Sequence, residues 1–429
     1  MENKKIKILV FTVPSWNSKV GANSWASLLE DYDSDNIASI FIRDEMPDSK
    51  VCSRYFNISE SKIIKSVLKR KTKTGTEITP QSDVNSKELQ EHNARYEKHG
   101  KKRRYSMLLA RELIWKLGKW KTKELDDFLD SFKPDIILHS MEGYIHLNRI
   151  IEYAIKRTGA KAIGYIWDDN FTYKQHKSLG YKLYRHFQRK SLKRLAKKTN
   201  AFFAITEKTK READEFFGID SVVLTKPLSA EPSVNYGELT KPIKMLYTGN
   251  LYIGRDRTLL RLVNSLKEQE NASENFKIEV YTQTRLSEEI KNELSCSFCT
   301  INEPISQNEA LEKQRKADIL LFLEDIDGKD SKVARLSFST KTTDYLSAGK
   351  CIFAIGDIDA APIEYLKEND AAIVASNDEE IKNAIQLIAS NNNILVEYAN
   401  NSANLGILKH NKKKIIDTFY KTIEDVLKG

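Results

Sequence analysis

The sequence predicts a protein of two doubly wound α/β domains, each built on a largely parallel β-sheet. Short apolar runs of strand length alternate with helical stretches, which is the pattern of βαβ units. A polar, proline-containing stretch at 229–242 interrupts this alternation, which then restarts. The length of 429 residues agrees, because a domain typically holds about 100 to 200 residues. We expect domains at 1–232 and 233–410, followed by a C-terminal helix at 411–429.

The first domain begins with the apolar run KILVFTV at residues 7–13, which indicates a buried strand that ends before Pro14. A loop with Gly21 and Ala22 follows, and a helix starts after Asn23. Further strands are predicted at 38–42, 135–139, 162–167, 201–206 and 222–224. Residues 60–105 break the pattern, because they are rich in Lys, Ser and Thr and poor in large apolar residues. We therefore expect a basic insertion there.

The second domain repeats the alternation of strands and helices. Its strands are predicted at 244–248, 277–282, 319–323, 351–355 and 372–374. Residues 412–427 form a charged amphipathic helix, with Ile415, Ile416, Phe419, Ile423 and Val426 at helical spacing. This helix must pack on one of the two domains, and it could return to the first.

Composition limits the class of protein. The chain is 40% hydrophobic and 30% charged, which argues against disorder of the whole chain. Four cysteines and the lack of a leader pattern favour a reducing cytoplasm. The longest apolar runs are far shorter than the roughly 20 residues that cross a bilayer. We therefore expect no spanning helix, but attachment to a membrane surface stays open.

Positive charge is concentrated in the first domain. The chain has a net charge of +9, yet residues 61–125 alone hold 18 Lys and Arg against 7 Asp and Glu. Residues 182–198 add eight basic residues and no acidic one. Trp115 and Trp120 lie among lysines in a helical segment, which suits an anionic membrane interface. The alternative is a surface helix whose tryptophans pack on the domain. Without a recognition motif, the charge gives nucleic-acid binding little weight.

The loop and helix at 337–355 are the richest candidate site. Ser339 and Thr340 suit the N-terminal cap of a helix, and Lys341 adds a charge to its free N–H groups. Asp344 lies on the same face as Thr340, where a carboxylate can accept hydrogen bonds from two sugar hydroxyls. This predicts a site for a phosphate and a ribose. The alternative is a capped helix with a Lys/Asp pair.

A second candidate loop follows the first strand of the second domain. Gly249 allows close approach of the backbone to a ligand, and Arg255 can bind a phosphate through two hydrogen bonds. Asn250 lies between them. Taken alone, such a loop is also compatible with an ordinary β-turn.

Together the two loops resemble the second domain of glycosyltransferase family 4-like enzymes of the GT-B fold. Gly249, Asn250, Leu251 and Arg255 match the family's first motif, and residues 340–355 match its later one. The resemblance implies that Arg255 and Lys341 hold the diphosphate of a nucleotide sugar while Asp344 binds its ribose, with both domains facing across a cleft. It also implies hexosyl transfer with retention, without metal or cofactor. The acceptor would be a saccharide or a lipid-linked saccharide of bacterial capsule, O-antigen or exopolysaccharide synthesis, on the inner face of the cell membrane.

The sequence also departs from the family. Leu336 stands where members often have a glutamate, and Asn250 stands where a basic residue is usual. Gly21 and Ala22 resemble in part the family's Gly-Gly loop near the donor. Trp167 occupies the position of a frequent active-site histidine, so Asp168 or Asp169, or His139 on a neighbouring strand, becomes the candidate catalytic residue.

Two other functions stay open: a nucleotide-sugar epimerase of the same fold, and a catalytically silent homologue that acts as a binding partner. Two apparent metal motifs are set aside. Asp325 and Asp327 are expected in a solvated loop, and Cys296 and Cys299 lack a second ligand pair. No metal site is predicted.

Overall fold

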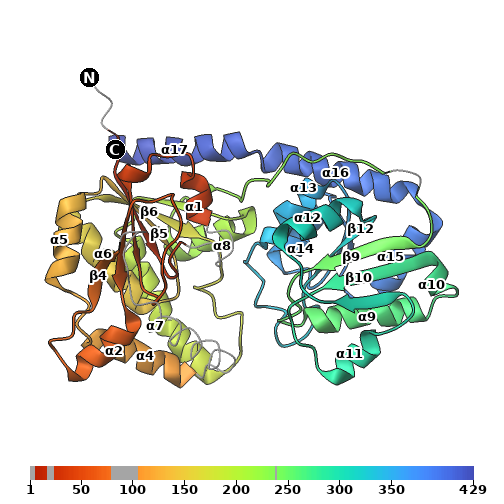
Figure 1. Cartoon of the computed structure of the whole chain (residues 1–429), viewed down its shortest axis with the longest axis horizontal. Coiled ribbons are helices and arrows are strands. Elements are labelled where there is room, and N and C mark those ends of the chain that lie inside the picture. The colour runs from red at the N-terminus through yellow and green to blue at the C-terminus, as the bar shows by residue number, and fades with distance from the viewer. Residues whose placement is uncertain (1–4, 17–23, 79–104, 237–238) are drawn as a thin grey trace. The chain divides into compact units, whose positions relative to one another are not determined.

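The computed structural model describes residues 5–16, 24–78, 105–236 and 239–429. The chain divides into two compact units (Figure 1). Unit 1 comprises residues 1–173, 177–224 and 416–429, and unit 2 comprises 174–176 and 225–415. Each unit is built on its own twisted sheet flanked by helices.

The sheet of unit 1 has the strand order β4-β3-β2-β1-β5-β6-β7-β8. Its strands are β1 (Ile8–Thr12), β2 (Ile37–Phe41), β3 (Arg54–Ile58), β4 (Gly75–Ile78), β5 (Ile136–Ser140), β6 (Lys161–Ile166), β7 (Ala201–Ala204) and β8 (Val222–Val223). All neighbours pair in parallel except β3 and β4. The strand order reverses between β1 and β5, and ligands of such sheets bind beyond the strand ends at this switch point.

Seven α-helices are described between these strands. They are α1 (Ser24–Leu29), α2 (Glu60–Leu68), α4 (Tyr105–Leu117), α5 (Lys123–Phe132), α6 (Ile145–Thr158), α7 (Leu179–Ala196) and α8 (Glu207–Phe217). Ser59, Thr122, Ser178 and Thr206 cap four of them through side-chain oxygens that accept backbone N–H bonds. Local sequence therefore sets where these helices begin.

The region predicted as an insertion is partly built into the sheet. Residues 60–78 of this region supply α2 and β4, and β3 directly precedes it. The sequence analysis did not predict either strand. β4 (GTEI) is a short edge strand with one large apolar residue and therefore lacks a periodic signal. Residues 79–104, the rest of the expected insertion, lie outside the described residues.

The sheet of unit 2 has six parallel strands in the order β11-β10-β9-β12-β13-β14. They are β9 (Ile243–Thr248), β10 (Phe276–Tyr281), β11 (Cys299–Asn302), β12 (Ile319–Leu323), β13 (Cys351–Ile355) and β14 (Ile373–Ala375). The flanking helices are α9 (Arg255–Lys267), α10 (Ala272–Asn275), α11 (Glu288–Leu294), α12 (Gln307–Lys316), α13 (Thr340–Ala348), α14 (Ala361–Glu368), α15 (Asp378–Ser390) and α16 (Asn393–Lys409). Apolar cores cover both faces of this sheet, and its switch point lies between β9 and β12.

The C-terminal helix α17 (Lys412–Lys428) packs on unit 1. The ring of Phe419 lies 6.3 Å from Trp25 and 5.9 Å from Phe203, and Tyr420 stacks on Tyr32. Its apolar stripe is therefore buried against α1 and β7. Among the described residues, every helix is too short or too polar to cross a membrane.

Candidate functional site

Lys341 lies at the switch point of unit 2, where the loop after β9 meets the first turn of α13. Its Nζ donates a hydrogen bond to Tyr247 Oη at 2.8 Å and lies 4.1 Å from the centre of the Tyr247 ring. Tyr247 Oη in turn donates to the carbonyl of Asn250 at 2.6 Å. The amine is thus fixed over the loop that begins the second candidate motif.

Gly249 makes this position of Lys341 possible. Its φ of 127° is one that residues with a side chain rarely adopt, and a Cβ there would stand 2.6 Å from Lys341 Nζ. The two residues predicted separately from the sequence therefore belong to one cluster.

Arg255, the first residue of α9, completes the cluster but has a partner that the sequence did not suggest. Its guanidinium donates to both carboxylate oxygens of Glu324, at 2.8 and 3.0 Å, and its Nε donates to the carbonyl of Leu323. Glu324 directly follows β12, and its side chain is only 4% exposed. Within the described part of the chain, no group bonds Nη1 of Arg255, so this edge of the guanidinium is open to a ligand.

The electrostatics of this cluster favour an anion. Burial, together with the charge of Arg255, lowers the pKa of Lys341 to about 7, and Glu324 offsets this only in part. Burial also disfavours the charged form of Arg255, but Glu324 outweighs it and raises its pKa. A bound anion would favour the charged form of Lys341, and the charged lysine would in turn bind the anion more tightly.

The remaining predicted donor-binding residues surround this cluster. Ser339 caps α13, with its Oγ accepting from the N–H of Lys341 at 3.3 Å, and Thr340 is exposed beside it. Asp344 is partly buried, and Lys226 Nζ lies 3.8 Å from its carboxylate. Burial raises the pKa of Asp344, and Lys226 counters this. Asn250 Oδ1 is buried without a hydrogen-bond partner among the described residues, so it is free to accept one from a ligand.

The sequence also singled out Leu336, Asp325 and Asp327. Leu336 is fully buried, so its position contributes to packing. Asp325 was expected in a solvated loop, but it is buried and accepts from Arg257 at 2.8 Å. Asp327 pairs with Arg261 at 3.0 Å. The expectation was wrong for Asp325 because Arg257 of α9 lies over the end of β12 and pairs with this carboxylate.

His139, predicted as a candidate catalytic residue, lies inside the sheet of unit 1. Its ring has no exposed surface, and Nε2 is 3.1 Å from Thr199 Oγ1. Burial lowers its pKa to about 4, so the ring is neutral near pH 7. A histidine within β5 cannot reach a substrate, and the structure does not support a catalytic role for it.

Asp168 follows β6, and its charge acts on Glu142, a residue that sequence reasoning missed. Glu142 follows β5 in the neighbouring loop and is partly buried. Burial and the Asp168 carboxylate raise the pKa of Glu142 to about 7, against a hydrogen bond from Trp167 and the charge of Arg43. The sequence could have indicated Glu142, because it comes just after the strand predicted at 135–139, and ligands bind beyond the ends of such strands.

Three further residues of the first domain were predicted from the sequence. Asp169 is buried and accepts hydrogen bonds from the backbone and hydroxyl of Thr172, which is a structural role. Gly21 and Ala22 lie outside the described residues.

Two doubly wound parallel-sheet domains define a protein of the GT-B fold. No protein-family model matches the sequence, and no curated protein matches it. Among solved structures, HepE of Anabaena in complex with UDP aligns with a TM-score of 0.63 at 8% identity, covering 98% of this chain and 100% of that one. The trehalose 6-phosphate synthase of Burkholderia multivorans aligns with a TM-score of 0.60 at 9% identity, covering 98% and 97%. At these identities the likeness shows the fold.

A third structure with the same fold carries a sugar phosphate. The UDP-forming trehalose-phosphate synthase of Burkholderia xenovorans, in complex with glucose-6-phosphate, aligns with a TM-score of 0.56 at 9% identity. It covers 99% of this chain and 100% of that one.

Proposed function

We propose that this protein is a glycosyltransferase that moves a sugar from a nucleoside diphosphate sugar to an acceptor hydroxyl. The main support is the cluster of Lys341, Gly249 and Arg255 at the switch point of unit 2, where a buried amine and a guanidinium meet a helix N-terminus. Similarity in fold to HepE in complex with UDP and to a UDP-forming trehalose-phosphate synthase adds to it.

In this proposal unit 2 holds the donor. Lys341, the free edge of Arg255 and the first turn of α13 stabilise the negative charge that develops on the departing diphosphate. Asp344 accepts hydrogen bonds from the ribose, and Asn250 accepts one from the bound nucleotide. A hexose donor, independence of metal ions and cofactors, and retention of configuration are what the family resemblance implies.

Nucleotide binding tests the donor site. Thermal unfolding of the purified protein would be followed with UDP, GDP, CMP, TDP and ADP, for the wild type and for Lys341→Ala and Arg255→Ala. We expect one nucleotide to raise the unfolding temperature and both substitutions to abolish this rise. Arg261→Ala is the matched control, because Arg261 lies on the same helix but pairs with exposed carboxylates.

The outcomes separate the alternatives. If no nucleotide stabilises the protein, the transferase proposal fails and the catalytically silent homologue takes its place. If a nucleotide binds and the bound nucleotide sugar changes configuration without transfer, the protein is an epimerase.

We also propose that unit 1 docks on an anionic membrane through α2, α4 and α7. Half of the 16 large apolar side chains that are exposed among the described residues lie on these helices: Ile64, Leu68, Met107, Leu113, Leu117, Leu179, Leu183 and Phe187. Leu68 is 89% exposed and Leu179 is 84% exposed. The three helices are neighbours, joined by the Arg111–Glu60 ion pair and by the contact of Tyr105 with Tyr181.

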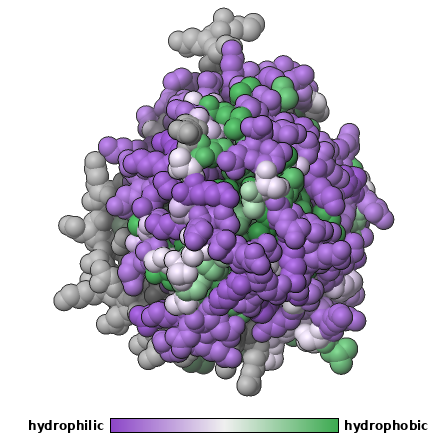
Figure 2. Space-filling view, turned by 90° about the vertical axis from the view of Figure 1, so that its right-hand side faces the viewer, coloured by the Kyte–Doolittle hydropathy of each residue, from purple (hydrophilic) through white to green (hydrophobic). Residues whose placement is uncertain are grey.

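Basic side chains flank these apolar residues. Lys65, Lys69 and Arg70 are exposed on or just after α2, and Lys182 and Lys190 are exposed on α7. Apolar side chains among lysines suit an interface where anionic headgroups meet acyl chains. By contrast, the face seen in Figure 2, on the side of α10 and α15, is mostly hydrophilic.

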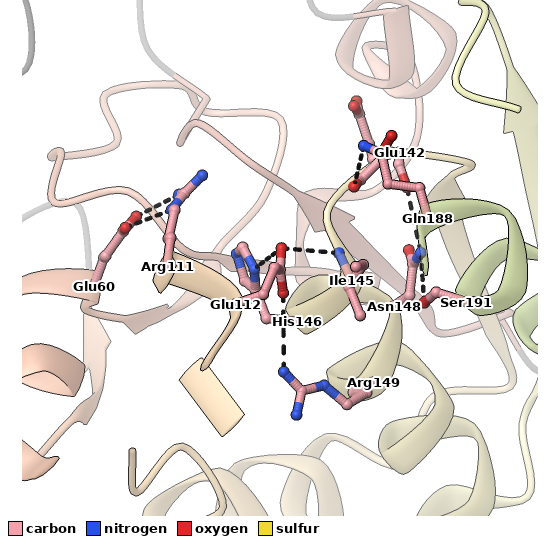
Figure 3. Close-up of polar contacts among 11 residues, drawn as sticks. Glu60, Arg111, Glu112, Glu142, Ile145, His146, Asn148, Arg149, Gln188 and Ser191 are labelled. Carbon is pink, nitrogen blue, oxygen red and sulfur yellow. Dashed lines mark hydrogen bonds and ion pairs between the residues drawn. The ribbon is translucent and has the colours of Figure 1, made fainter. Parts of the chain in front are cut away.

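The residues that carry this surface differ from the expected ones. Trp115 is fully buried and stacks on His146 at 4.4 Å, while His146 bonds Glu112 at 2.9 Å (Figure 3). Trp120 is half-buried and packs against Tyr153. The tryptophans hold α4 and the segment after it on the unit. In our proposal the exposed leucines, rather than the tryptophans, contact the membrane.

Vesicle sedimentation tests the docking surface. We expect binding to vesicles rich in phosphatidylglycerol, weaker binding at high salt, and little binding to phosphatidylcholine alone. The double substitution Leu179→Ser and Leu183→Ser should weaken binding. Ile407→Ser with Leu408→Ser on α16 is the control, because these residues are comparably exposed in unit 2. Binding of a DNA duplex instead of vesicles would refute the proposal.

Because unit 1 docks on a membrane in our proposal, we also propose that the acceptor is a saccharide, in particular a lipid-linked saccharide of bacterial surface-polysaccharide assembly. The protein would work in the cytoplasm at the inner face of the cell membrane. Transfer to a lipid-linked acceptor in vesicles, compared with transfer to the free saccharide, would test this part.

A further inference from the structure

Lys226 is a cation of unit 2 that lies beside the candidate donor site and belongs to neither of its sequence motifs. It is in the segment that precedes β9, and its Nζ is 3.8 Å from Oδ1 of Asp344. The two side chains are 20% and 19% exposed, respectively. Asp344 comes three residues after Lys341 in α13, so these two residues lie on the same side of the helix. Lys226 therefore stands next to the carboxylate that we propose for the ribose.

The backbone of Lys226 is held by the residue that ends α16. The ring of His410 is fully buried, and its Nδ1 donates to the carbonyl of Lys226 at 2.8 Å. Because a carbonyl only accepts, Nδ1 carries the proton, and Nε2 accepts from Tyr365 Oη at 2.8 Å. The N–H of Leu228 donates to the carbonyl of His410 at 3.0 Å. The ring also stacks on Phe338, just before the cap of α13, with the ring centres 5.9 Å apart. One ring thus fixes both the segment of Lys226 and the start of α13.

The pair of Lys226 and Asp344 has unused capacity for hydrogen bonds. Its separation of 3.8 Å suits an ion pair but exceeds the usual N–H···O hydrogen-bond length of about 2.7–3.2 Å. Among the described residues, no group donates a hydrogen bond to the Asp344 carboxylate or accepts one from Lys226 Nζ. Burial raises the pKa of Asp344, and the charge of Lys226 counters this. A ligand that bonds both groups would therefore satisfy two partly desolvated charges.

A vicinal diol matches this pair. The ionised carboxylate only accepts hydrogen bonds and the ammonium only donates them, whereas each hydroxyl of a ribose does both. One hydroxyl can accept from Lys226 and donate to Asp344, and its neighbour can donate to the second carboxylate oxygen. Hydrogen bonds to charged groups are stronger than those between neutral groups. Loss of either hydroxyl would leave part of the pair unsatisfied.

We propose that Lys226, together with Asp344, contacts the two hydroxyls of the nucleotide ribose and so selects a ribonucleotide donor over a 2′-deoxyribonucleotide donor. The inference rests on the proposed transferase function and adds a specificity-determining residue to its donor site. The 2′-hydroxyl is the group that distinguishes the two sugars. A thymidine diphosphate sugar should therefore be a poor donor, because its deoxyribose lacks this hydroxyl.

A general electrostatic role for Lys226 predicts a different result. If Lys226 only adds to the positive field that attracts the diphosphate, its removal weakens the binding of ribonucleotides and deoxyribonucleotides by the same factor. If Lys226 contacts the ribose, its removal narrows the difference between them. The ratio of the two dissociation constants separates these roles, whatever the change in overall affinity.

Isothermal titration calorimetry would measure this ratio. UDP, GDP, ADP and CMP are each compared with their 2′-deoxy and 3′-deoxy forms, on the wild type, Lys226→Met and Asp344→Ala. For the nucleotide that binds, we expect loss of either hydroxyl to weaken binding to the wild type by about 10- to 100-fold. Both variants should lose most of this discrimination.

Lys244→Met is the matched control. Lys244 is exposed near the start of β9, at the opposite end of the strand from Gly249. The substitution removes one positive charge from unit 2 and should keep the wild-type ratio. Circular dichroism would show that the variants keep their fold, and the comparison on the wild type requires no variant.

The outcomes separate this inference from the function on which it rests. Equal affinity of the wild type for the ribo and deoxy forms would overturn the proposal, and so would a full ratio in Lys226→Met or binding of TDP alone. Each of these results leaves the transferase function intact. Absence of binding by every nucleotide would instead refute the transferase function, and the inference with it.

Discussion

At the scale of single residues, the unusual feature of unit 2 is a lysine that is only partly charged at neutral pH. Burial and Arg255 lower the pKa of Lys341 to about 7 in the free protein. A bound diphosphate favours the charged form and raises this pKa. Below pH 7 the amine is already protonated, whereas above pH 7 binding must take up a proton.

We therefore predict that the affinity for the nucleoside diphosphate falls above pH 7, by up to about tenfold per pH unit. Isothermal titration calorimetry at pH 8, in buffers of different ionisation enthalpy, should show uptake of about one proton on binding. Lys341→Arg should remove this dependence, because arginine stays charged. An affinity independent of pH in the wild type would show that Lys341 does not contact the diphosphate.

At the scale of elements, the turn between β9 and α9 is shaped to admit the side chain of Lys341. We predict that Gly249→Ala abolishes stabilisation by the nucleotide, because the methyl group displaces the amine and the backbone is strained at this φ. Circular dichroism would show that the fold is kept, and thermal unfolding with the nucleotide would show the lost shift.

The control for this prediction is Gly159→Ala at the end of α6. Gly159 also has a positive φ, but a Cβ there meets nothing within 4 Å. It should lower the free energy of unfolding by about 1 kcal/mol and leave the nucleotide shift unchanged. Loss of the shift in both variants would mean that strain, and not the position of Lys341, controls binding.

Elements with strong apolar periodicity were predictable from the sequence, and weakly patterned ones were not. The strands β1, β12 and β13 are continuous buried apolar runs, which is why their positions and the parallel class followed from sequence. The strands β4 and β11 lie at sheet edges and carry little apolar pattern.

Some residues of the candidate site were likewise predictable from the sequence, and others were not. Lys341, Gly249 and Arg255 were predictable because each belongs to a short motif of consecutive residues. Glu324 and Glu142 are single residues after strands, and each gains its partner only when the topology places strand ends side by side.

At the scale of the whole molecule, the two units have separate cores, and one helix from the end of the chain completes unit 1. The buried ring of Phe419 on α17 contacts Trp25 and Phe203, which lie far away in sequence. Nucleotide binding is proposed for unit 2. Loss of this ring should therefore weaken one unit without affecting the ligand site of the other.

We predict that Phe419→Ala lowers the free energy of unfolding of unit 1 by about 3 to 5 kcal/mol, since truncation of a buried aromatic leaves a cavity. Differential scanning calorimetry should resolve two transitions, because two-domain proteins need not unfold as one. The substitution should lower one transition, and the nucleotide should still raise the other. Leu408→Ala, at a residue 67% exposed near the end of α16, should change neither. If Phe419→Ala lowers both transitions equally, the units unfold together, and the C-terminal helix stabilises the whole chain rather than unit 1 alone.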